Sequence, residues 1–314
     1  MKSDPTSIER VASIDIGTNT ILLLIAEIDD GELNSLFEKE TIVRLGEGLQ
    51  KNGILSNEAM ERGLQTLAQY LERCQELKVQ RIYAAGTNAL REAKNSGEFL
   101  NLAKEKMNLS IEVISGEEEA RLSFLAVAKD LKEMGGRVIV VDVGGGSTEF
   151  ILGEDGRVTQ WVSLPLGSVR FTEQFLISDP VREGEWERMD EEIGERLIDV
   201  PRPDMPLSMV AVGGTATTLA SVEQGLKEFV PEKIHCFVLK KEALRNQLFL
   251  YRSKTLDERK KIPGLPPPRA DVILAGAAIL YRAMDELKCS SVLISCHGVR
   301  YGLLYKKLNL NLRF

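Results

Sequence analysis

The sequence predicts an α/β protein made of two related halves, and three observations lead to this fold class. An apolar segment followed by an Asp and a small Gly-containing turn occurs at residues 10–19 and recurs at 138–149. Strand-like and helix-like segments alternate along the chain, as they do in α/β domains. The 314 residues, 43% of them hydrophobic, are enough for two domains with cores of their own.

Apolar runs predict the strands in chain order. The first half is expected to hold strands at 10–16, 20–28, 33–40, 81–85 and 111–114. The second half is expected to hold strands at 138–142, 148–153, 158–164, 208–212 and 291–295. Each of the two Asp residues therefore stands at the end of a strand.

Four helices are predicted, at 56–77, 117–131, about 180–198, and 270–287. The first shows Met60, Leu64, Leu67 and Leu71 at steps of three and four residues, the period of an amphipathic helix. The third is dense in charge and reads as a solvated surface helix. The proline-rich segment 261–269 can be neither helix nor central strand and is expected to be a loop.

The boundary between the halves is placed in the helix at 117–131, because one strand set ends before it and the other begins after it. The sequence thus predicts a first lobe at 1–124 and a second at 125–314. The last helix, about 298–314, is expected to pack back on the first lobe.

Charge and composition exclude several classes of protein. A net charge of −7 argues against general affinity for nucleic acid. The N-terminus lacks a signal sequence, and the apolar run 21–26 is too short to span a bilayer, so a cytoplasmic protein without membrane contact is expected. Nine Lys or Arg residues between 240 and 269 could approach a polyanion or could form an ordinary solvated face.

The four cysteines predict reduced, mostly buried thiols. His235-Cys236 and Cys296-His297 do not indicate zinc, because neighbouring residues rarely share one tetrahedral metal and no further Cys or His completes either pair.

Two glycine-containing turns suggest phosphate binding. Asp15, Gly17, Thr18 and Asn19 form the first; Asp142, Gly144, Gly145, Gly146, Ser147, Thr148 and Glu149 form the second. Glycine lets main-chain N–H groups converge on an anion. Paired carboxylates beside such a turn need a metal or a proton, which makes a hairpin or bulge without function a weaker explanation.

The segment 115–121, Ser-Gly-Glu-Glu-Glu-Ala-Arg, could supply a catalytic base. Ser115 with Glu118 also matches a capping box, which explains one or two of the acids. Three successive glutamates cannot share one helix face, so at least one points elsewhere. Residues 84–95 and 210–218 are further strand-to-helix junctions where backbone N–H groups and an Arg can hold phosphate.

Eight segments in this order resemble the exopolyphosphatase and guanosine pentaphosphate phosphohydrolase (Ppx/GppA) family. They are DIGTNT (15–20), AGTNALREAKN (85–95), ISGEEEARL (114–122), VDVGGGSTE (141–149), SLPLGSVRFTE (163–173), VGGTATTLA (212–220), RADVILAG (269–276) and ISCHGVRYG (294–302). The resemblance implies the actin-like, sugar-kinase-like superfold, with two ribonuclease-H-like lobes around a central cleft. It also implies release of terminal phosphate from inorganic polyphosphate or pppGpp.

The resemblance assigns roles to individual residues. Glu119 matches the base that activates water, and Asp142 and Glu149 match the carboxylates that hold Mg²⁺, with Mn²⁺ as an alternative. The two turns match phosphate loops, Arg91 matches an arginine that clamps phosphate, and Arg269 matches a further cationic contact. Gly213, Gly214 and Thr215 lie in the 210–218 junction, which is of the kind that can cover a phosphate or a base, and the family suggests a homodimer.

Two positions depart from the family pattern. Leu22 stands where a basic residue or His is common, which weakens the expectation of a guanosine tetraphosphate-type ligand, and Tyr301 stands where an acid is common. The chain ends at residue 314, so short polyphosphates or (p)ppGpp-type nucleotides are favoured over long chains. Two other functions remain open: a (p)ppGpp sensor without turnover and a small-molecule kinase of the same superfold.

Overall fold

The computed structural model describes residues 9–130, 136–202 and 207–310. The chain divides into two compact units, of which unit 1 comprises Met1–Ser115 with Val299–Arg313, and unit 2 is formed by Gly116–Gly298. The predicted boundary at 124/125 falls nine residues later, inside the helix α5 (Gly116–Asp130). This helix packs on three strands of unit 2, and for that reason it belongs entirely to unit 2.

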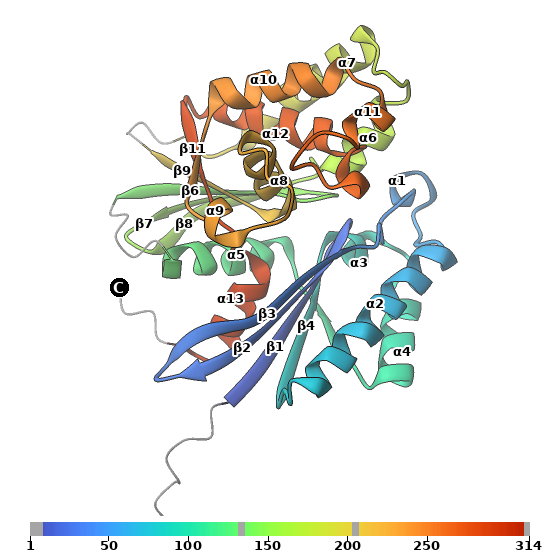
Figure 1. Cartoon of the computed structure of the whole chain (residues 1–314), viewed down its shortest axis with the longest axis vertical. Coiled ribbons are helices and arrows are strands. Elements are labelled where there is room, and N and C mark those ends of the chain that lie inside the picture. The colour runs from blue at the N-terminus through green and yellow to red at the C-terminus, as the bar shows by residue number, and fades with distance from the viewer. Residues whose placement is uncertain (1–8, 131–135, 203–206, 311–314) are drawn as a thin grey trace, which may run out of the picture. The chain divides into compact units, whose positions relative to one another are not determined.

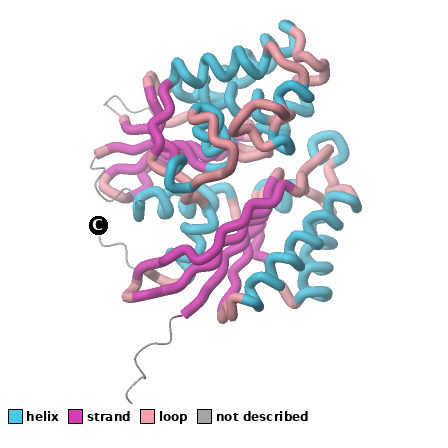
Figure 2. Tube along the Cα trace, viewed as in Figure 1, coloured by secondary structure: helices cyan, strands magenta, loops and turns pink. Residues whose placement is uncertain are grey.

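Unit 1 is a five-stranded sheet flanked by helices (Figures 1 and 2). Its strands are β1 (Glu9–Ile16), β2 (Thr20–Asp29), β3 (Glu32–Ile42), β4 (Arg81–Gly86) and β5 (Ile111–Val113). Its helices are α1 (Leu49–Asn52), α2 (Asn57–Glu76), α3 (Asn88–Glu92), α4 (Ser96–Met107) and α13 (Val299–Lys307). The strand order is β3-β2-β1-β4-β5.

Alternation along β1 decides which side chains face which helices. Ile14 and Ile16 join the apolar core that α2 and α4 cover. Ser13 points to the opposite face, where its hydroxyl donates to the Arg300 carbonyl of α13 at 2.7 Å. Successive strand residues face opposite sides, so Asp15 lies on the α13 face, away from the main core.

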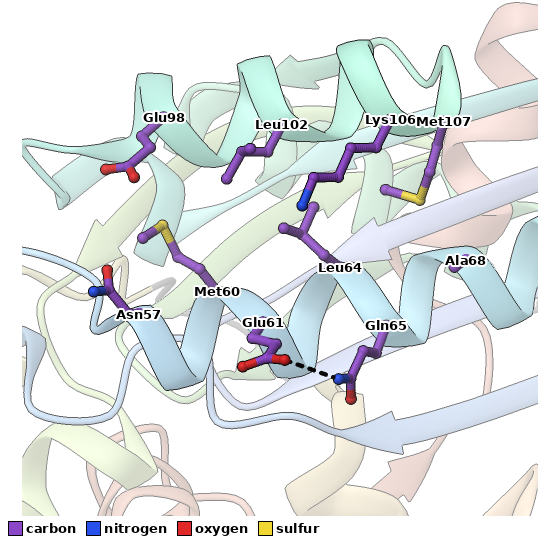
Figure 3. Close-up of a pocket in the computed structure, with 10 residues that line it drawn as sticks. All are labelled: Asn57, Met60, Glu61, Leu64, Gln65, Ala68, Glu98, Leu102, Lys106 and Met107. Carbon is purple, nitrogen blue, oxygen red and sulfur yellow. Dashed lines mark hydrogen bonds between the residues drawn. The ribbon is translucent and has the colours of Figure 1, made fainter.

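A groove lies between α2 and α4 in unit 1, with a volume of about 640 Å³ (Figure 3). Its ten lining residues are Asn57, Met60, Glu61, Leu64, Gln65, Ala68, Glu98, Leu102, Lys106 and Met107. None of these is a residue to which the sequence assigns a function.

Unit 2 is a larger layered domain with a six-stranded sheet, in the order β10-β11-β9-β6-β7-β8. The strands are β6 (Arg137–Val143), β7 (Thr148–Glu154), β8 (Arg157–Leu164), β9 (Ser208–Val212), β10 (Phe237–Lys240) and β11 (Ser291–Ile294). Besides α5, the helices are α6 (Ser168–Phe175), α7 (Glu183–Arg196), α8 (Gly213–Glu223), α9 (Pro231–Ile234), α10 (Lys241–Arg252), α11 (Leu256–Arg259) and α12 (Ile273–Glu286), with short 3₁₀ turns η1 (Leu197–Asp199) and η2 (Pro267–Arg269).

The two faces of the unit 2 sheet carry different layers. Val140, Ile151 and Val212 pack against Phe124 of α5. The alternate residues, such as Val141, pack against the larger helical layer that contains α12 (Figure 1). Asp142 and Glu149 follow the first alternation and therefore face α5.

The two sheets share one topology, which confirms the predicted duplication. Strands β3-β2-β1-β4-β5 correspond to β8-β7-β6-β9-β11, with the same antiparallel and parallel pairings. Each second strand also carries a register shift at the same distance from its turn, after Ile25 in β2 and after Leu152 in β7. An antiparallel hairpin followed by parallel strands in both units defines the ribonuclease-H-like fold predicted from the resemblance.

All ten predicted strands are present within two residues of their expected ends. The predicted helix at 180–198 is α7, but Met189 and Ile193 are buried, so one face packs into the core. Strand β10 was not predicted, because a four-residue strand shows too little alternation. Helix α8 was expected only as the start of a helix at the 210–218 junction, without bounds, because Gly213 and Gly214 are poor helix formers.

Candidate active site

Strand register brings two carboxylates together in unit 2. Asp142 is the penultimate residue of β6 and pairs directly with Glu149, the second residue of β7. Directly opposed residues of antiparallel strands have Cβ atoms about 4.5–5.5 Å apart. The register therefore places both acids on the face of the sheet that α5 covers. The sequence placed the two acids beside the same turn but did not show which face they share.

Hydroxyl groups bind both carboxylates. Ser123 of α5 donates to Asp142 Oδ2 at 2.8 Å. Ser147 and Ser163 both donate to Glu149 Oε1, at 2.9 and 2.7 Å. No Lys or Arg forms an ion pair with either acid in the ranges that the structure describes. The negative charge is thus stabilised by neutral donors alone.

Burial and mutual repulsion perturb these acids. Glu149 is 1% exposed, and its burial, reinforced by the Glu119 and Asp142 charges, raises its pKa well above the usual value. Burial also raises the pKa of Asp142, with the Ser123 hydrogen bond acting in the opposite direction. Three like charges gathered in a poorly hydrated place favour a bound cation or proton.

The three successive glutamates of α5 have different environments. Glu119 is 8% exposed and lies near enough to Glu149 to raise its pKa. Glu117 instead pairs with Arg121 at 2.6 Å on the helix surface. The expectation that the three point different ways is confirmed, and Arg121 is engaged with Glu117.

The glycine turn between β6 and β7 is held from behind by the start of α6. Its carbonyl groups accept hydrogen bonds: Gly144 from the N–H of Ser168, and Gly145 from those of Val169 and Arg170. The Arg170 side chain donates to the Gly146 carbonyl at 2.7 Å. This packing requires glycine at position 167, where a Cβ would lie 2.3 Å from the Gly145 oxygen.

The N–H groups of the same turn remain available. Gly144 N–H closes the turn on the Ser147 carbonyl at 3.0 Å. Those of Gly145, Gly146 and Ser147 donate to no acceptor among the residues that the structure describes. Consecutive main-chain N–H groups in a turn are the arrangement on which anion-binding nests are built.

Thr148 does not join this cluster. It is fully buried, and its hydroxyl donates to the Leu166 carbonyl. Because neighbouring strand residues face opposite sides, Thr148 points to the helical core while Glu149 points to α5. Its hydroxyl therefore supports the turn, and the predicted contact of residue 148 with phosphate stays a prediction.

The strand-to-helix junction at 213–215 lies beside the carboxylates. A Cβ on Gly213, whose φ is +85°, would stand 2.7 Å from Asp142 Oδ1. A Cβ on Gly214 would stand 2.0 Å from the guanidinium of Arg269, which is 6% exposed. The Thr215 hydroxyl donates to the Val143 carbonyl at 3.2 Å. Arg269 is thus a buried cation next to this junction.

The first glycine turn, in unit 1, has the same backbone pattern. Gly17 N–H donates to the Thr20 carbonyl at 2.9 Å, as Gly144 N–H does to Ser147. Asp15 pairs with Leu22, as Asp142 pairs with Glu149. Leu22 therefore occupies the position of the second carboxylate, so the paired acids belong to unit 2 alone.

Asn19 is the most informative residue of the unit 1 turn. Its carbonyl accepts from the N–H groups of Val43 and Arg44. Its side-chain amide is 6% exposed, and both polar atoms lack a hydrogen-bond partner within the described ranges. A buried amide in this state is suited to a ligand, because leaving it unsatisfied costs about 1–3 kcal/mol.

Other predicted residues of unit 1 have partners within the protein. Thr18 is buried, with its hydroxyl 3.5 Å from Asn88 Oδ1. Arg91 Nη1 donates to the Ile114 carbonyl at 3.1 Å. The Tyr301 hydroxyl donates to Glu38 at 2.6 Å. Tyr301, which differs from the family pattern, therefore has a structural role in unit 1.

Several cations of the basic stretch 240–269 pair with nearby acids, which favours the expectation of an ordinary protein face over that of an approach to a polyanion. Arg252 pairs with Glu183, and Lys260 pairs with Asp257. Arg259 is buried beside Asp179 at 3.5 Å. These cations serve local ion pairs.

Sequence reasoning left Ser123 and Ser163 without a role, although both bind the acids. Ser123 stands four residues after Glu119 and therefore on the same helix face. Ser163 pairs with Glu149 across β7 and β8, a neighbour that only the strand register reveals.

The donor set fits Mg²⁺. Asp142 and Glu149 present oxygen atoms, the ligands that hard divalent cations prefer. Glu149 is buried and Asp142 is partly buried, and neither has a cationic partner in the described part of the chain. Both properties suit a metal, and Mn²⁺ accepts similar ligands.

The duplicated sheet, with paired carboxylates beside a glycine turn of unit 2, defines an α/β protein of the ribonuclease-H-like class. The chain belongs to the Ppx/GppA phosphatase family, whose model matches residues 24–311. In the described residues, no helix is long and apolar enough to cross a membrane.

Several known proteins are similar to this chain. It is 34% identical over 314 residues to exopolyphosphatase 2 of Mycobacterium tuberculosis, covering 95% of this chain and 98% of that protein. A structure of the Ppx/GppA family member of Aquifex aeolicus has a TM-score of 0.81 and 38% identity, covering 96% and 98% of the two chains. A bifunctional 3-dehydroquinate synthase/phosphatase of Fusobacterium nucleatum is 33% identical over 296 residues, 90% of this chain and 44% of that one. The chain thus spans less than half the length of this relative.

Proposed function

We propose that this chain is an exopolyphosphatase, which releases terminal orthophosphate from inorganic polyphosphate. The observation that carries the proposal is the grouping of Asp142, Glu149 and Glu119 on the α5 face of the unit 2 sheet, where Asp142 and Glu149 flank a turn with three N–H groups lacking acceptors in the described residues. The similarity to the mycobacterial exopolyphosphatase supports the substrate class.

The turn would bind the phosphate to be released. Its N–H groups at Gly145, Gly146 and Ser147 would donate to non-bridging oxygens, whose charge grows or shifts during phosphoryl transfer. The three contacts need no rearrangement of the turn, because α6 already holds its carbonyl side.

Glu119 would act on the attacking water. Its carboxylate takes a proton from water as the water oxygen bonds to phosphorus, and the bridging P–O bond breaks. The products are orthophosphate and a polyphosphate one unit shorter. Glu119 suits this role because it lies in the first turn of α5, buried near Glu149.

Asp142 and Glu149 would hold Mg²⁺, which offsets phosphate charge when bound. Ser123, Ser147 and Ser163 orient the two carboxylates by hydrogen bonds. These hydroxyl groups are the only described hydrogen-bond donors to the two carboxylate side chains in the structure.

The test compares two glutamates of one helical turn. We expect Glu119→Gln to lower kcat by about 10²–10⁴-fold, the usual contribution of a general base, with substrate binding retained. The matched control is Glu117→Gln, which removes the same charge from a surface pair with Arg121. Equal activity of the Glu119 variant and wild type would reject the assignment.

Substrate class is decided by phosphate release from short polyphosphate, long polyphosphate and pppGpp, and by ATP turnover with and without sugars. The proposal expects the highest kcat/KM for polyphosphate. A higher kcat/KM for pppGpp would still identify a hydrolase, but with pppGpp as its substrate. Binding without release would favour a nucleotide sensor, and sugar-dependent ATP turnover would favour a kinase.

A further inference from the structure

Strand pairing in unit 2 brings the two histidines of the chain together. Strands β10 and β11 are antiparallel, with Phe237 opposite Ile294. The ladder continues beyond β10, because the Cys236 N–H donates to the Ile294 carbonyl at 2.8 Å. The segments 235–236 and 296–297, which the sequence treated as separate incomplete pairs, therefore lie side by side. The argument from the sequence considered each pair separately and could not show that the two histidines are neighbours.

The last residue of α5 completes the group. Both carboxylate oxygens of Asp130 lie close to His297 Nδ1, at 2.7 and 2.6 Å. His235 Nε2 lies 3.8 Å from Asp130 Oδ2. The two imidazole rings stack with centroids 4.7 Å apart. One ligand atom from each residue falls within 4.8 Å of the others.

We propose that Asp130, His235 and His297 form a binding site for a divalent transition metal of the zinc class. Two imidazole nitrogens and one carboxylate oxygen are ligands that zinc accepts and that Mg²⁺ uses rarely. The side chains of His235 and His297 are 27% and 23% exposed, so an ion can reach them.

Neighbouring groups orient the proposed ligands. The Ser295 hydroxyl donates to Asp130 Oδ2 at 3.4 Å and accepts from the His297 N–H at 3.1 Å. His235 Nδ1 accepts from the Cys296 N–H at 3.3 Å. Coordination through Nε2 moves the ring proton to Nδ1, so this long hydrogen bond must open. At His297, the metal replaces the proton that Nδ1 shares with Asp130, and affinity therefore falls as pH is lowered.

The site is distinct from the carboxylates around Glu119. Glu119 and Asp130 lie eleven residues apart on α5, which corresponds to about 16 Å along the helix axis. A metal at Asp130 would tie the last turn of α5 to the ends of β10 and β11. The same helix carries Glu119 in its first turn.

The experiment measures Zn²⁺ uptake by the full chain, prepared without a histidine tag and stripped with EDTA. Zn²⁺ is titrated against a chromophoric chelator in excess Mg²⁺, which occupies oxygen-ligand sites. We expect one Zn²⁺ per wild-type chain, and a loss of affinity of at least about tenfold in His297→Gln and in Asp130→Asn. Gln keeps a hydrogen bond to Asp130, so loss of the fold is avoided, and circular dichroism checks it. Asp257→Asn, on the surface, is the matched control.

Two further variants separate this site from the proposed catalysis. Asp142→Asn should retain Zn²⁺ uptake, whereas His235→Gln combined with His297→Gln should abolish it. Thermal melting should show stabilisation by Zn²⁺ in wild type and none in the double variant. Equal Zn²⁺ uptake by wild type and the double variant would overturn the proposal, and so would no uptake by wild type. Asp130, His235 and His297 would then be a hydrogen-bonded group that binds no metal.

Discussion

Replacing Glu149 by Gln should make the metal-free protein more stable and much less active. The side chain is 1% exposed, and Ser147 and Ser163 both donate to the same oxygen, Oε1. Gln keeps an oxygen that can accept both hydrogen bonds and removes the charge. The substitution therefore changes the electrostatics of the site with little change in shape.

The size of the effect follows from opposing contributions. Two charge-assisted hydrogen bonds become neutral ones, which costs about 1–2 kcal/mol. An unpaired buried charge costs several kcal/mol, although the group can reduce this penalty by taking up a proton. We expect a net gain of about 1–2 kcal/mol at pH 8, or about 2–4 °C in Tm for each kcal/mol in a unit of this size.

The pH dependence has a definite sign. Burial and the Glu119 and Asp142 charges raise the folded-state pKa of Glu149. A raised pKa favours the folded protein below the unfolded value of about 4.3, and this contribution is lost as pH rises through the folded value. Gln does not titrate. The gain in Tm should therefore be small near pH 5 and largest near pH 8.

Thermal melts in EDTA at pH 5 and pH 8, together with phosphate release in Mg²⁺, test these expectations. Activity should fall by about 10²–10⁴-fold or more. Glu154→Gln is the control, because Glu154 ends the same strand and forms an exposed pair with Arg137. A Glu149 variant that melts below wild type at pH 8, or a gap that is the same at both pH values, would refute the reasoning.

Three other substitutions test separate features. Asp142→Asn should abolish the rise in Tm caused by Mg²⁺, which in wild type corresponds to about 2.7 kcal/mol at 100 times Kd. Gly214→Ala should lower activity by about a hundredfold and stability by about 1–3 kcal/mol, because the new Cβ would stand 2.0 Å from the Arg269 guanidinium. Tyr301→Phe should cost about 1–3 kcal/mol in melting experiments and leave kcat unchanged, because the hydroxyl group that donates to Glu38 is removed.

One control substitution and three contrary results bear on these expectations. Gly97→Ala places a Cβ in open space on α4 and should leave activity unchanged. An active Gly214 variant would show that the contact with Arg269 has no catalytic consequence. Stabilisation of the Asp142 variant by Mg²⁺ would place the metal elsewhere. A Tyr301 variant with wild-type Tm would mean that Glu38 finds equivalent partners.

Much of the fold follows from local sequence patterns. Strands such as β1, β2 and β6 are apolar runs that pack in a sheet with a buried face, and a run of this kind is visible without any knowledge of partners. The extent of helix α8 could not be predicted in the same way. Its two starting glycines disfavour a helix locally, and burial of residues such as Leu219 and Ala220 in the unit 2 core overrides that preference.

The residues of the candidate site divide in the same way, into those that local sequence reveals and those that only strand register reveals. Asp142, Glu149 and Glu119 stand in conspicuous motifs, because acids beside a glycine turn are unusual in local sequence. Ser163 is an ordinary serine in a strand, and only the register with Glu149 gives it a role. The sequence neighbours of Thr148 suggested that it binds phosphate. Strand alternation instead turns its side chain toward the helical core of unit 2.

The sequence by itself determined the duplicated strand-and-turn pattern, the Ppx/GppA resemblance and the acids available for chemistry, because all of these are encoded in contiguous residues. Tertiary structure decided which of three adjacent glutamates is buried, that position 22 is the counterpart of Glu149, and that His235 and His297 meet at Asp130. The physical reason is that burial, charge repulsion and ligand geometry depend on distances between side chains far apart in the chain, which strand register and helix packing alone set.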